Sequence, residues 1–430
     1  MVSEPIEVSL KGTFEEMGQQ YIQQLGPKII EFSKLLEEDL RFENPADDSM
    51  FKAKTNAIVD MVIKANAYPN EIMRMYQAMA QSDFAIENNL TLNKLIALDL
   101  SVFLTTIHPK VVPPDWIASL RKPESCSFFA ITQNGGSVQD DLGVGRNFDW
   151  PEYAMHAFSA FPIVLHLDCT EPGYSNMVTL ISYPGSISGL TQFNDIGLTW
   201  SINSANVAMD VNIPGGMRLD FPYLPGAALI DMFQSVNFKD LYERTKSSPS
   251  GYPCTINITG RNITETAAIE KCPIHAQKPG GFKNIARTYN SDNVENETDR
   301  ITDNGYVHTN LVLAKGWEKY LGKKPNQTTA SFAAERQDNL KKLVNDLSSR
   351  QASVLKSVTS YLERELEPEG GATKKLPRKE PFRNDVALTH YSTAFCPLKD
   401  KLKVRFQQAD SAIAQEGKFT PWKTIRTNRP

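Results

Sequence analysis

The chain has 430 residues, and its 46 Lys and Arg against 50 Asp and Glu give a formal net charge of −4. A chain of this length with 41% hydrophobic residues can bury a large core and form more than one structural unit. The near-balanced charge argues against a nucleic-acid binder that works through a general basic field. No apolar run approaches the ~20 residues that a bilayer-spanning helix needs, so we expect no membrane span.

The N-terminal residues and the cysteines bear on the compartment. The segment that begins at Met1 has neither the basic region nor the apolar stretch of a secretory signal, so we expect a cytoplasmic protein. Five cysteines are too few for a disulfide scaffold, and their odd number leaves at least one thiol free. Cys254 and Cys272 flank a predicted hairpin, where they either pair in an oxidising compartment or remain separate buried thiols.

The first third of the chain is predicted to be helical. Thr13 followed by Glu16 is a capping-box pattern. Apolar residues then recur at helical spacing at Phe14, Met17, Tyr21 and Leu25. Helical periodicity continues over 51–79 and 92–103. The stretch 109–124 is interrupted by prolines and is predicted to be an exposed connector.

From Cys126 onward the pattern changes to a mixture of strands and helices. The predicted strands are 126–132, 142–150, 163–167, 177–182, 197–202, 255–258, 387–395 and 402–406. The predicted helices are 224–233, 330–347 and 352–366, and the segment 367–383 is predicted to be a loop. Hairpins interspersed with helices favour an α+β fold with antiparallel or mixed sheets covered by helices. We therefore divide the chain into a helical N-terminal segment, 1–125, and a mixed α/β body, 126–430.

Cys126 stands directly after the connector, at the start of a predicted strand. Cleavage of the Ser125–Cys126 peptide bond would give Cys126 a free α-amine with a pKa of ~7.7–8.0, able to act as a base toward its own thiol. The alternative is an ordinary buried thiol. Signatures of zinc and nucleotide-phosphate sites are absent from the sequence, so we predict no cofactor and no metal.

Several short motifs occur in an order that resembles one enzyme group. They are Gly12-Thr-Phe-Glu-Glu-Met-Gly18, Cys126-Ser127, Gly145-Arg-Asn-Phe-Asp-Trp150, Gln192-Phe-Asn-Asp-Ile-Gly-Leu198 followed by Asn203, His308-Thr-Asn310, and the strand pair from Ala387 to Phe406. This order is similar to that of the cysteine-nucleophile branch of the N-terminal nucleophile (Ntn) hydrolases. The chain most resembles the fungal acyl-coenzyme A:6-aminopenicillanate acyltransferase family. Bile salt hydrolases, acid ceramidase and N-acylethanolamine acid amidase are more distant.

The resemblance implies a four-layer αββα sandwich that cleaves itself between Ser125 and Cys126. The N-terminal segment then becomes the smaller chain of a heterodimer whose fragments stay together, or a partly removed propeptide. It implies that Cys126 is the nucleophile, that Arg146 favours its thiolate and that Asp149 holds its amine. It assigns Asn203 to the oxyanion hole, Asn310 to the amine or the hole, and a looser catalytic role to Arg336. On a regular strand Arg146 and Asp149 face opposite sides, so both serve one site only if the strand ends or bulges near Phe148.

The function predicted from these residues is a self-processing amidohydrolase that cleaves a linear N-acyl amide through a Cys126 thioester. Trp150 and Tyr183 are candidates for the acyl pocket, and the expected partner is a small-molecule acyl amide. Three alternatives stay open. They are transfer of the acyl group to an amine, a conventional Cys–His hydrolase using His308, and an unprocessed homologue that binds acyl ligands without turnover.

Overall fold

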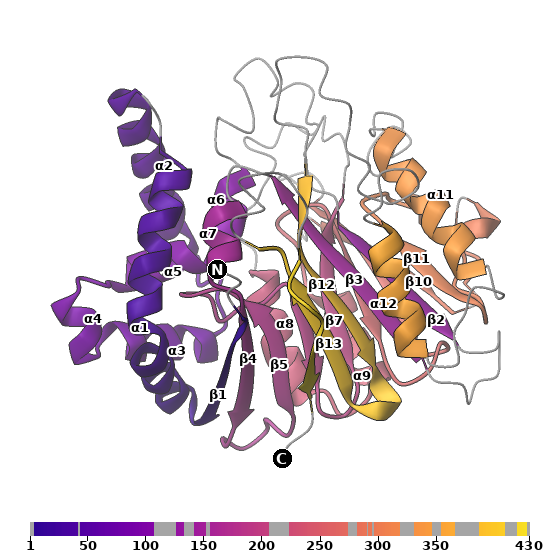
Figure 1. Ribbon diagram of the computed structural model, residues 1–430, viewed down its shortest axis with the longest axis horizontal. Coiled ribbons are helices and arrows are strands. Elements are labelled where there is room, and N and C mark those ends of the chain that lie inside the picture. Colours follow the sequence, from indigo (N-terminus) through magenta and orange to yellow (C-terminus); the bar gives the residue numbers. More distant parts are fainter. Residues whose placement is uncertain are drawn as a thin grey trace.

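The computed structural model describes residues 4–41, 44–106, 126–132, 142–151, 155–205, 223–273, 282–289, 291–294, 296–318, 331–345, 354–365, 387–408 and 419–427. Its strands form two sheets (Figure 1). The larger sheet has, in spatial order, β1 (Ile6–Gly12), β4 (Ile163–Cys169), β5 (Met177–Ser182), β6 (Thr191–Asn194), β7 (Thr199–Ser204), β8 (Cys254–Thr259), β9 (Thr266–Pro273) and β10 (Phe282–Thr288). Within it β1 runs parallel to β4, and every other neighbouring pair is antiparallel.

The smaller sheet is antiparallel throughout. Its spatial order is β11 (Gly305–His308), β2 (Ser127–Thr132), β3 (Leu142–Pro151), β12 (Ala387–Cys396), β13 (Lys401–Phe406) and β14 (Lys423–Arg426). The two sheets face each other: the rings of Phe193 on β6 and Phe395 on β12 lie 4.9 Å apart, and Thr191 is hydrogen-bonded to Tyr391 at 2.7 Å. The core therefore lies between the sheets, with side chains from both.

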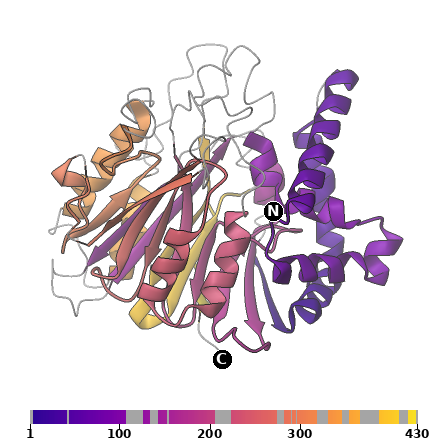
Figure 2. The same cartoon turned by 180° about the vertical axis from the view of Figure 1, so that it is seen from behind.

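Helices cover the outer face of each sheet. α11 (Ser331–Asn345) and α12 (Val354–Glu365) pack on β2, β3, β11 and β12, and α12 lies in front of them in Figure 1. α8 (Leu224–Gln234) and α9 (Phe238–Ser247) pack on strands of the larger sheet and come to the front in the reverse view of Figure 2. This arrangement of helix, sheet, sheet and helix confirms the predicted αββα sandwich.

The N-terminal helices stand beside the β1–β4 edge of the larger sheet (Figure 1). They are α1 (Phe14–Asp39), α2 (Pro45–Lys64), α3 (Asn70–Ala80), α4 (Asp83–Glu87), α5 (Leu92–Asp99) and α6 (Ser101–Thr106), and α7 (Met155–Ala160) packs on α1. The predicted capping box is confirmed, because Glu16 N donates to Thr13 Oγ1 at 3.2 Å and Thr13 N donates to Glu16 Oε2 at 2.7 Å. The strand β1, which precedes α1, was not predicted.

Two of the predicted helices are broken. The helical periodicity over 51–79 belongs to two helices, because α2 ends at Lys64 and α3 begins at Asn70. Asn66 adopts a left-handed conformation with φ of 48°, and Pro69 lacks the N–H that a continuing helix requires. The predicted helix over 92–103 likewise divides into α5 and α6.

The predicted strands and helices of the body are observed, most with ends shifted by one to three residues. The hairpin predicted between Cys254 and Cys272 is observed as β8 and β9. The short strands β6, β11 and β14, and the strand β10, were missed. The connector 109–124, the turn 133–136 and the loop 367–383 lie outside the described residues. The five cysteines are all described and buried, and none of them forms a disulfide, so Cys254 and Cys272 are separate thiols.

Candidate active site

Cys126 lies immediately before β2, buried between the two sheets with 3% of its surface exposed. β2 pairs with β3 so that Ser127 lies opposite Asn147 and Phe128 opposite Arg146. This pairing brings the Cys126 Sγ atom to 3.8 Å from Arg146 Nη2. The motif Gly145 to Trp150 is therefore next to the predicted nucleophile because the hairpin folds it there.

Arg146 is anchored to the larger sheet. Its guanidinium donates to Thr191 Oγ1 at 2.6 Å and to the backbone carbonyls of Leu190 and Ile202. With 1% exposure it is a fixed cation that cannot swing away from the thiol. Thr191 in turn is bonded to Tyr391, whose ring stacks on Phe148 at 5.1 Å.

Asp149 is fully buried and also acts on Cys126. Burial raises the pKa of the Cys126 thiol, while the positive charge of Arg146 opposes that increase. The Asp149 charge raises this pKa further, whereas a hydrogen bond from the Asp149 backbone lowers it. The thiol of the intact chain is therefore protonated near neutral pH, and a nearby base is needed to form the nucleophilic thiolate.

The pairing of β3 with β12 is irregular beside Asp149. Where β3 pairs with β12, Phe148 lies opposite Tyr391 but Asp149 lies opposite Thr389, so His390 is an extra residue in β12. Such a bulge bends the sheet and redirects side chains. The sequence analysis required β3 itself to end or bulge near Phe148, whereas the extra residue lies in β12. A shared orientation of the Arg146 and Asp149 side chains toward Cys126 stays a prediction.

Arg336 of α11 joins three other parts of the site. Its Nη1 atom donates to the Cys126 carbonyl at 3.0 Å and to Ser127 Oγ at 2.9 Å, and Nη2 donates to Asn310 Oδ1 at 2.6 Å. Asn310 donates onward to the Ser204 carbonyl at 2.8 Å. The structure thus brings Arg336 and Asn310 together with Cys126, as the sequence analysis expected.

Asn203 also lies near Asn310, but its side-chain amide points toward the backbone of residues 308–309. Its Nδ2 group donates to the carbonyls of His308 and Thr309 at 3.3 and 3.1 Å. Both amide protons are used by these bonds, so in this arrangement Asn203 connects β7 to residues 308–309. Its role as an oxyanion donor stays a prediction.

The remaining predicted residues fall elsewhere. Ser125 and the side chain of Trp150 lie outside what the structure describes. Tyr183 is buried, and its hydroxyl donates to the Asp99 carbonyl at 3.1 Å. Its ring contacts Phe158, which contacts His390, so an aromatic row rather than a direct contact connects it to the site.

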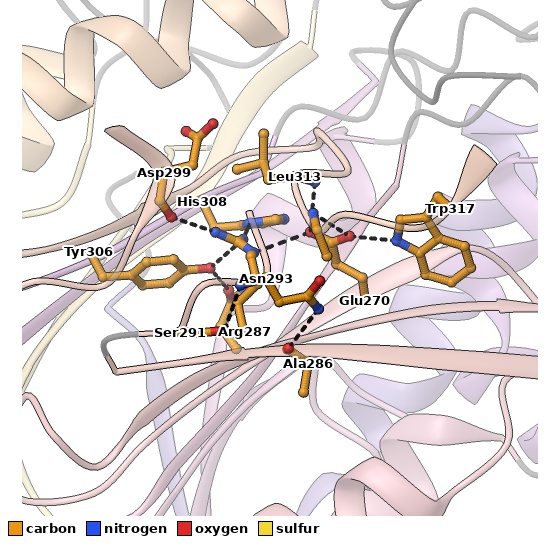
Figure 3. A network of polar contacts seen from close by, with 12 residues as sticks. Glu270, Ala286, Arg287, Ser291, Asn293, Asp299, Tyr306, His308, Leu313 and Trp317 are labelled. Atoms are coloured by element: carbon orange, nitrogen blue, oxygen red, sulfur yellow. Dashed lines mark hydrogen bonds and ion pairs between the residues drawn. The ribbon is translucent and has the colours of Figure 1, made fainter. Parts of the chain in front are cut away.

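His308 does not have the properties of a catalytic base. Its Nδ1 atom accepts from Arg287 Nη2 at 2.6 Å, which places its proton on Nε2 (Figure 3). Burial and the Arg287 charge both hold the pKa of His308 well below its usual value. With Nδ1 occupied and Nε2 protonated, the neutral ring has no free lone pair, which argues against the Cys–His alternative.

Sequence reasoning missed the residues that hold the site together. Thr191, Ser204 and Tyr391 anchor Arg146 and Asn310. Arg287, which is paired with Glu270, contacts His308 (Figure 3). The only sequence signal was position, since Thr191 precedes a recognised motif and Ser204 follows Asn203. Among the described residues no group of three or more His, Cys, Asp and Glu could hold a metal ion. No helix of the described part of the chain is long and apolar enough to cross a membrane.

No protein-family model and no curated protein matches this chain. It is similar to the solved structure of the Caenorhabditis elegans orthologue of N-acylethanolamine-hydrolyzing acid amidase, with 14% identity, a TM-score of 0.39, and coverage of 63% of this chain and 93% of that one. Penicillin V acylase from Agrobacterium tumefaciens has 11% identity, a TM-score of 0.37, and coverage of 65% and 82%. A mutant of the conjugated bile acid hydrolase from Clostridium perfringens has 13% identity, a TM-score of 0.35, and coverage of 70% and 92%.

Proposed function

We propose that this chain is an amidohydrolase of the Ntn type that uses Cys126 as its nucleophile after cleavage of the Ser125–Cys126 bond. The observation that carries the proposal is the buried Cys126 thiol, 3.8 Å from the fixed guanidinium of Arg146 and influenced by Asp149. A cation beside a thiol stabilises the thiolate, which is the reactive form. The order of the sequence motifs supports the same assignment.

Cleavage would supply the base that the site requires. Hydrolysis of the Ser125–Cys126 peptide bond gives Cys126 an α-amine, and its neutral fraction near pH 7–8 can accept the thiol proton. Asp149 is near enough to act on the Cys126 thiol and is our candidate to orient that amine. The motifs place both groups on one hairpin, so one local fold supplies nucleophile, base and orienting carboxylate.

The proposed reaction has two half-reactions. The Cys126 sulfur attacks the acyl carbonyl carbon to form a C–S bond, and its proton passes through the α-amine to the leaving nitrogen as the C–N bond breaks. Water then attacks the thioester and gives a proton to the α-amine, which passes it to the departing Cys126 sulfur as the C–S bond breaks, releasing a carboxylic acid and restoring the thiol. Oxyanion stabilisation is assigned to a backbone N–H with the Asn203 or Asn310 amide, supported by Arg336.

The N-terminal segment is proposed to remain bound after cleavage, which would make a heterodimer. Strand β1 of this segment pairs along its whole length with β4 of the body. Arg74 on α3 forms an ion pair with Glu171 of the body at 2.8 Å, and Phe14 N donates to the same carboxylate at 2.9 Å. These contacts do not depend on the peptide bond before Cys126.

A denaturing gel with N-terminal sequencing of the large fragment tests the proposal. We expect a fragment that begins Cys-Ser-Phe-Phe, and we expect Cys126→Ala to remain a single chain without amide turnover. Cys396→Ala is the matched control, because Cys396 is also a buried free thiol of the smaller sheet. An intact chain that cleaves amides, or a Cys126→Ala variant that still processes itself, contradicts the proposal.

The acyl acceptor and acyl chain are separate parts of the proposal. Chromogenic amides with acyl chains of increasing length measure the preference of the pocket to which Trp150 and Tyr183 are assigned. Adding an amine acceptor then separates hydrolysis from transfer: we expect the free acid as the main product, whereas a main product of new amide identifies an acyltransferase. Binding of the amides without turnover by an unprocessed chain would identify the non-catalytic alternative.

A further inference from the structure

Glu270 on β9 and Arg287 on β10 form an ion pair in the interior of the molecule. Glu270 Oε1 lies 3.3 Å from Arg287 Nε, and each side chain is 1% exposed. In the β9–β10 register Arg287 lies opposite Ala268, two residues from Glu270, so the two side chains are diagonal neighbours on one face of the sheet. Two charges in this environment require further hydrogen bonds to compensate for lost hydration.

The Glu270 carboxylate receives those bonds from the segment that follows β11. Leu313 N donates to Oε1 at 2.7 Å, Ala314 N donates at 3.1 Å, and Trp317 Nε1 donates to Oε2 at 2.8 Å (Figure 3). Backbone N–H groups that bind a buried carboxylate fix the course of the chain there. Glu270 therefore holds residues 313–317 against β9.

Arg287 holds the other end of this segment. Its Nη2 atom contacts His308 Nδ1 at 2.6 Å and Tyr306 OH at 3.2 Å, and its Nη1 atom donates to the Asp299 carbonyl at 2.8 Å (Figure 3). The carbonyl of His308 is also one of the two that Asn203 binds. The ion pair thus brackets residues 308–314, with Arg287 at the start and Glu270 at the end.

Asn310 lies within residues 308–314, the segment held by the ion pair and its hydrogen bonds, which together we call the bracket. Asn310 contacts the nucleophile through Arg336. Its Oδ1 atom accepts from Arg336 at 2.6 Å, and Arg336 donates to the Cys126 carbonyl at 3.0 Å. Thr309, beside it, donates its backbone N–H to Gln337 Oε1 at 3.0 Å. Movement of the bracketed segment would change both the Asn310–Arg336 contact and the backbone that Asn203 binds.

We infer that Glu270 and Arg287 are positioning residues that set the place of Asn310, and of the His308 and Thr309 carbonyls, at the Cys126 site. This inference rests on the proposed function for its effect on turnover. The bracket itself is independent of any reaction, since it consists of hydrogen bonds within the chain. The two parts can therefore be measured separately.

Lys271 provides a matched control, because it follows Glu270 on β9 and points to the opposite face of the sheet. It is equally buried at 1% exposure, and its Nζ donates to the carbonyls of Thr245 on α9 and of Ser248 at 2.5 and 2.6 Å. Glu270→Gln and Lys271→Met each remove one buried charge from the same strand. Both variants are expected to lower the melting temperature, but only the first loosens the bracket.

The experiment compares these two full-length variants with the wild-type chain. Hydrogen–deuterium exchange in peptides covering 309–318 is expected to quicken at least tenfold in Glu270→Gln and to stay within twofold in Lys271→Met. Turnover of an amide is expected to show a kcat at least tenfold lower in Glu270→Gln with KM within twofold, and an unchanged kcat in Lys271→Met. Equal exchange in the two variants would overturn the inference, as would equal kcat values.

Two further outcomes are also decisive. If the wild-type chain turns over no amide, the proposed function fails, and the exchange comparison alone supports or overturns the bracket. If Glu270→Gln does not fold, Glu270→Asp takes its place, because it keeps the charge but shortens the reach to Leu313 and Trp317. Faster exchange in 309–318 than in Lys271→Met then supports the inference, and equal exchange rejects it.

Discussion

Two buried polar clusters of this molecule differ in the groups that stabilise a negative charge. In the cation cluster (Cys126, Arg146 and Arg336), the Arg146 guanidinium lies beside the Cys126 thiol and the Arg336 guanidinium donates to the Cys126 carbonyl. In the phenol cluster, neutral hydroxyl groups surround the Asp99 carboxylate. Tyr68 OH donates to Asp99 Oδ2 at 2.7 Å and Ser186 Oγ donates to Oδ1 at 2.6 Å.

The phenol cluster joins the N-terminal helices to the body. The hydroxyls of Tyr21 on α1 and Tyr76 on α3 accept from the backbone N–H groups of Gly185 and Ile187, at 3.0 and 3.2 Å. Tyr21 OH also donates to the Ser186 carbonyl at 3.1 Å. These bonds fix the loop after β5, whereas the cation cluster draws its side chains from the body alone.

The two clusters serve different purposes: the cation cluster influences the reactivity of Cys126, and the phenol cluster attaches the N-terminal helices to the body. Burial is the largest influence on both acids and raises the pKa of both Cys126 and Asp99. Only Cys126 has a cation beside it to oppose that increase; hydroxyl hydrogen bonds are what oppose it at Asp99. A cluster that stabilises an anion by full charges suits chemistry, and a cluster of neutral donors suits attachment of one layer to another.

Removing the cation beside the thiol should have the largest effect. We expect Arg146→Met to lower kcat/KM by roughly 10²–10³-fold, because the thiolate loses its nearest positive charge. The control is Arg405→Met, which removes another buried arginine of the smaller sheet, packed between the rings of Phe419 and Trp422. Comparable kcat/KM for the two folded variants would show that Arg146 serves only stability.

Removing the acid of the phenol cluster should affect folding and not chemistry. We expect Asp99→Ala to lower the free energy of unfolding by ~2–3 kcal/mol, because it leaves the Tyr68 and Ser186 hydroxyls buried without their acceptor. Denaturant titration measures this loss, and kcat per folded molecule should stay within twofold. A kcat loss as large as that of Arg146→Met would remove the distinction between the clusters.

The crossing of α1 and α3 gives a second test of cohesion. A Cβ atom added at Gly18 on α1 would lie 2.4 Å from the Met75 carbonyl oxygen, a backbone atom that cannot turn aside. We expect Gly18→Ala to separate the helices that carry Tyr21 and Tyr76 and to lower the unfolding free energy by ~1–3 kcal/mol. Thermal melts measure the effect; an unchanged melting temperature would mean that the crossing tolerates the extra atom.

At neutral pH the smallest expected effect on stability comes from the titration of His390, in the bulge beside Asp149. Burial lowers the pKa of His390 to about 3, while the unfolded chain has the ordinary value of ~6.5. Between these values the unfolded state binds more protons, so stability rises with pH and falls on acidification, by up to ~1.4 kcal/mol per pH unit. His390→Phe should flatten the dependence of unfolding free energy on pH in this window; an unaltered slope would exclude His390 as its source.

Local patterns in the sequence predicted much of this fold. The α1 capping box, the β2–β3 hairpin and the strands β4, β5, β7, β8, β12 and β13 are encoded by neighbouring residues. The strand β1 was missed because its pairing partner, β4, lies more than 150 residues away along the chain. The break after Lys64 depends on Asn66 and Pro69, and the spacing of apolar residues does not detect such single helix-ending residues.

Only those residues of the candidate site that belong to recognised sequence motifs, or lie near them, could be predicted. Cys126, Arg146, Arg336 and Asn310 lie together as expected. The Glu270–Arg287 pair gave no signal, because a buried acid and a buried arginine on adjacent strands look like ordinary surface residues in sequence. Their role depends on which face of the sheet each side chain takes, and that is settled by packing.

The parallel pairing of β1 with β4 has a consequence for colloidal behaviour. Every residue of β4 except Asp168 is fully buried, and β1 covers the backbone hydrogen-bonding groups along the outer side of this apolar strand. A body stripped of its N-terminal segment would present that side as an open sheet edge, which is a template for intermolecular strand addition. The N-terminal segment thus protects the sheet edge from aggregation, and we expect the body to precipitate when this segment is removed.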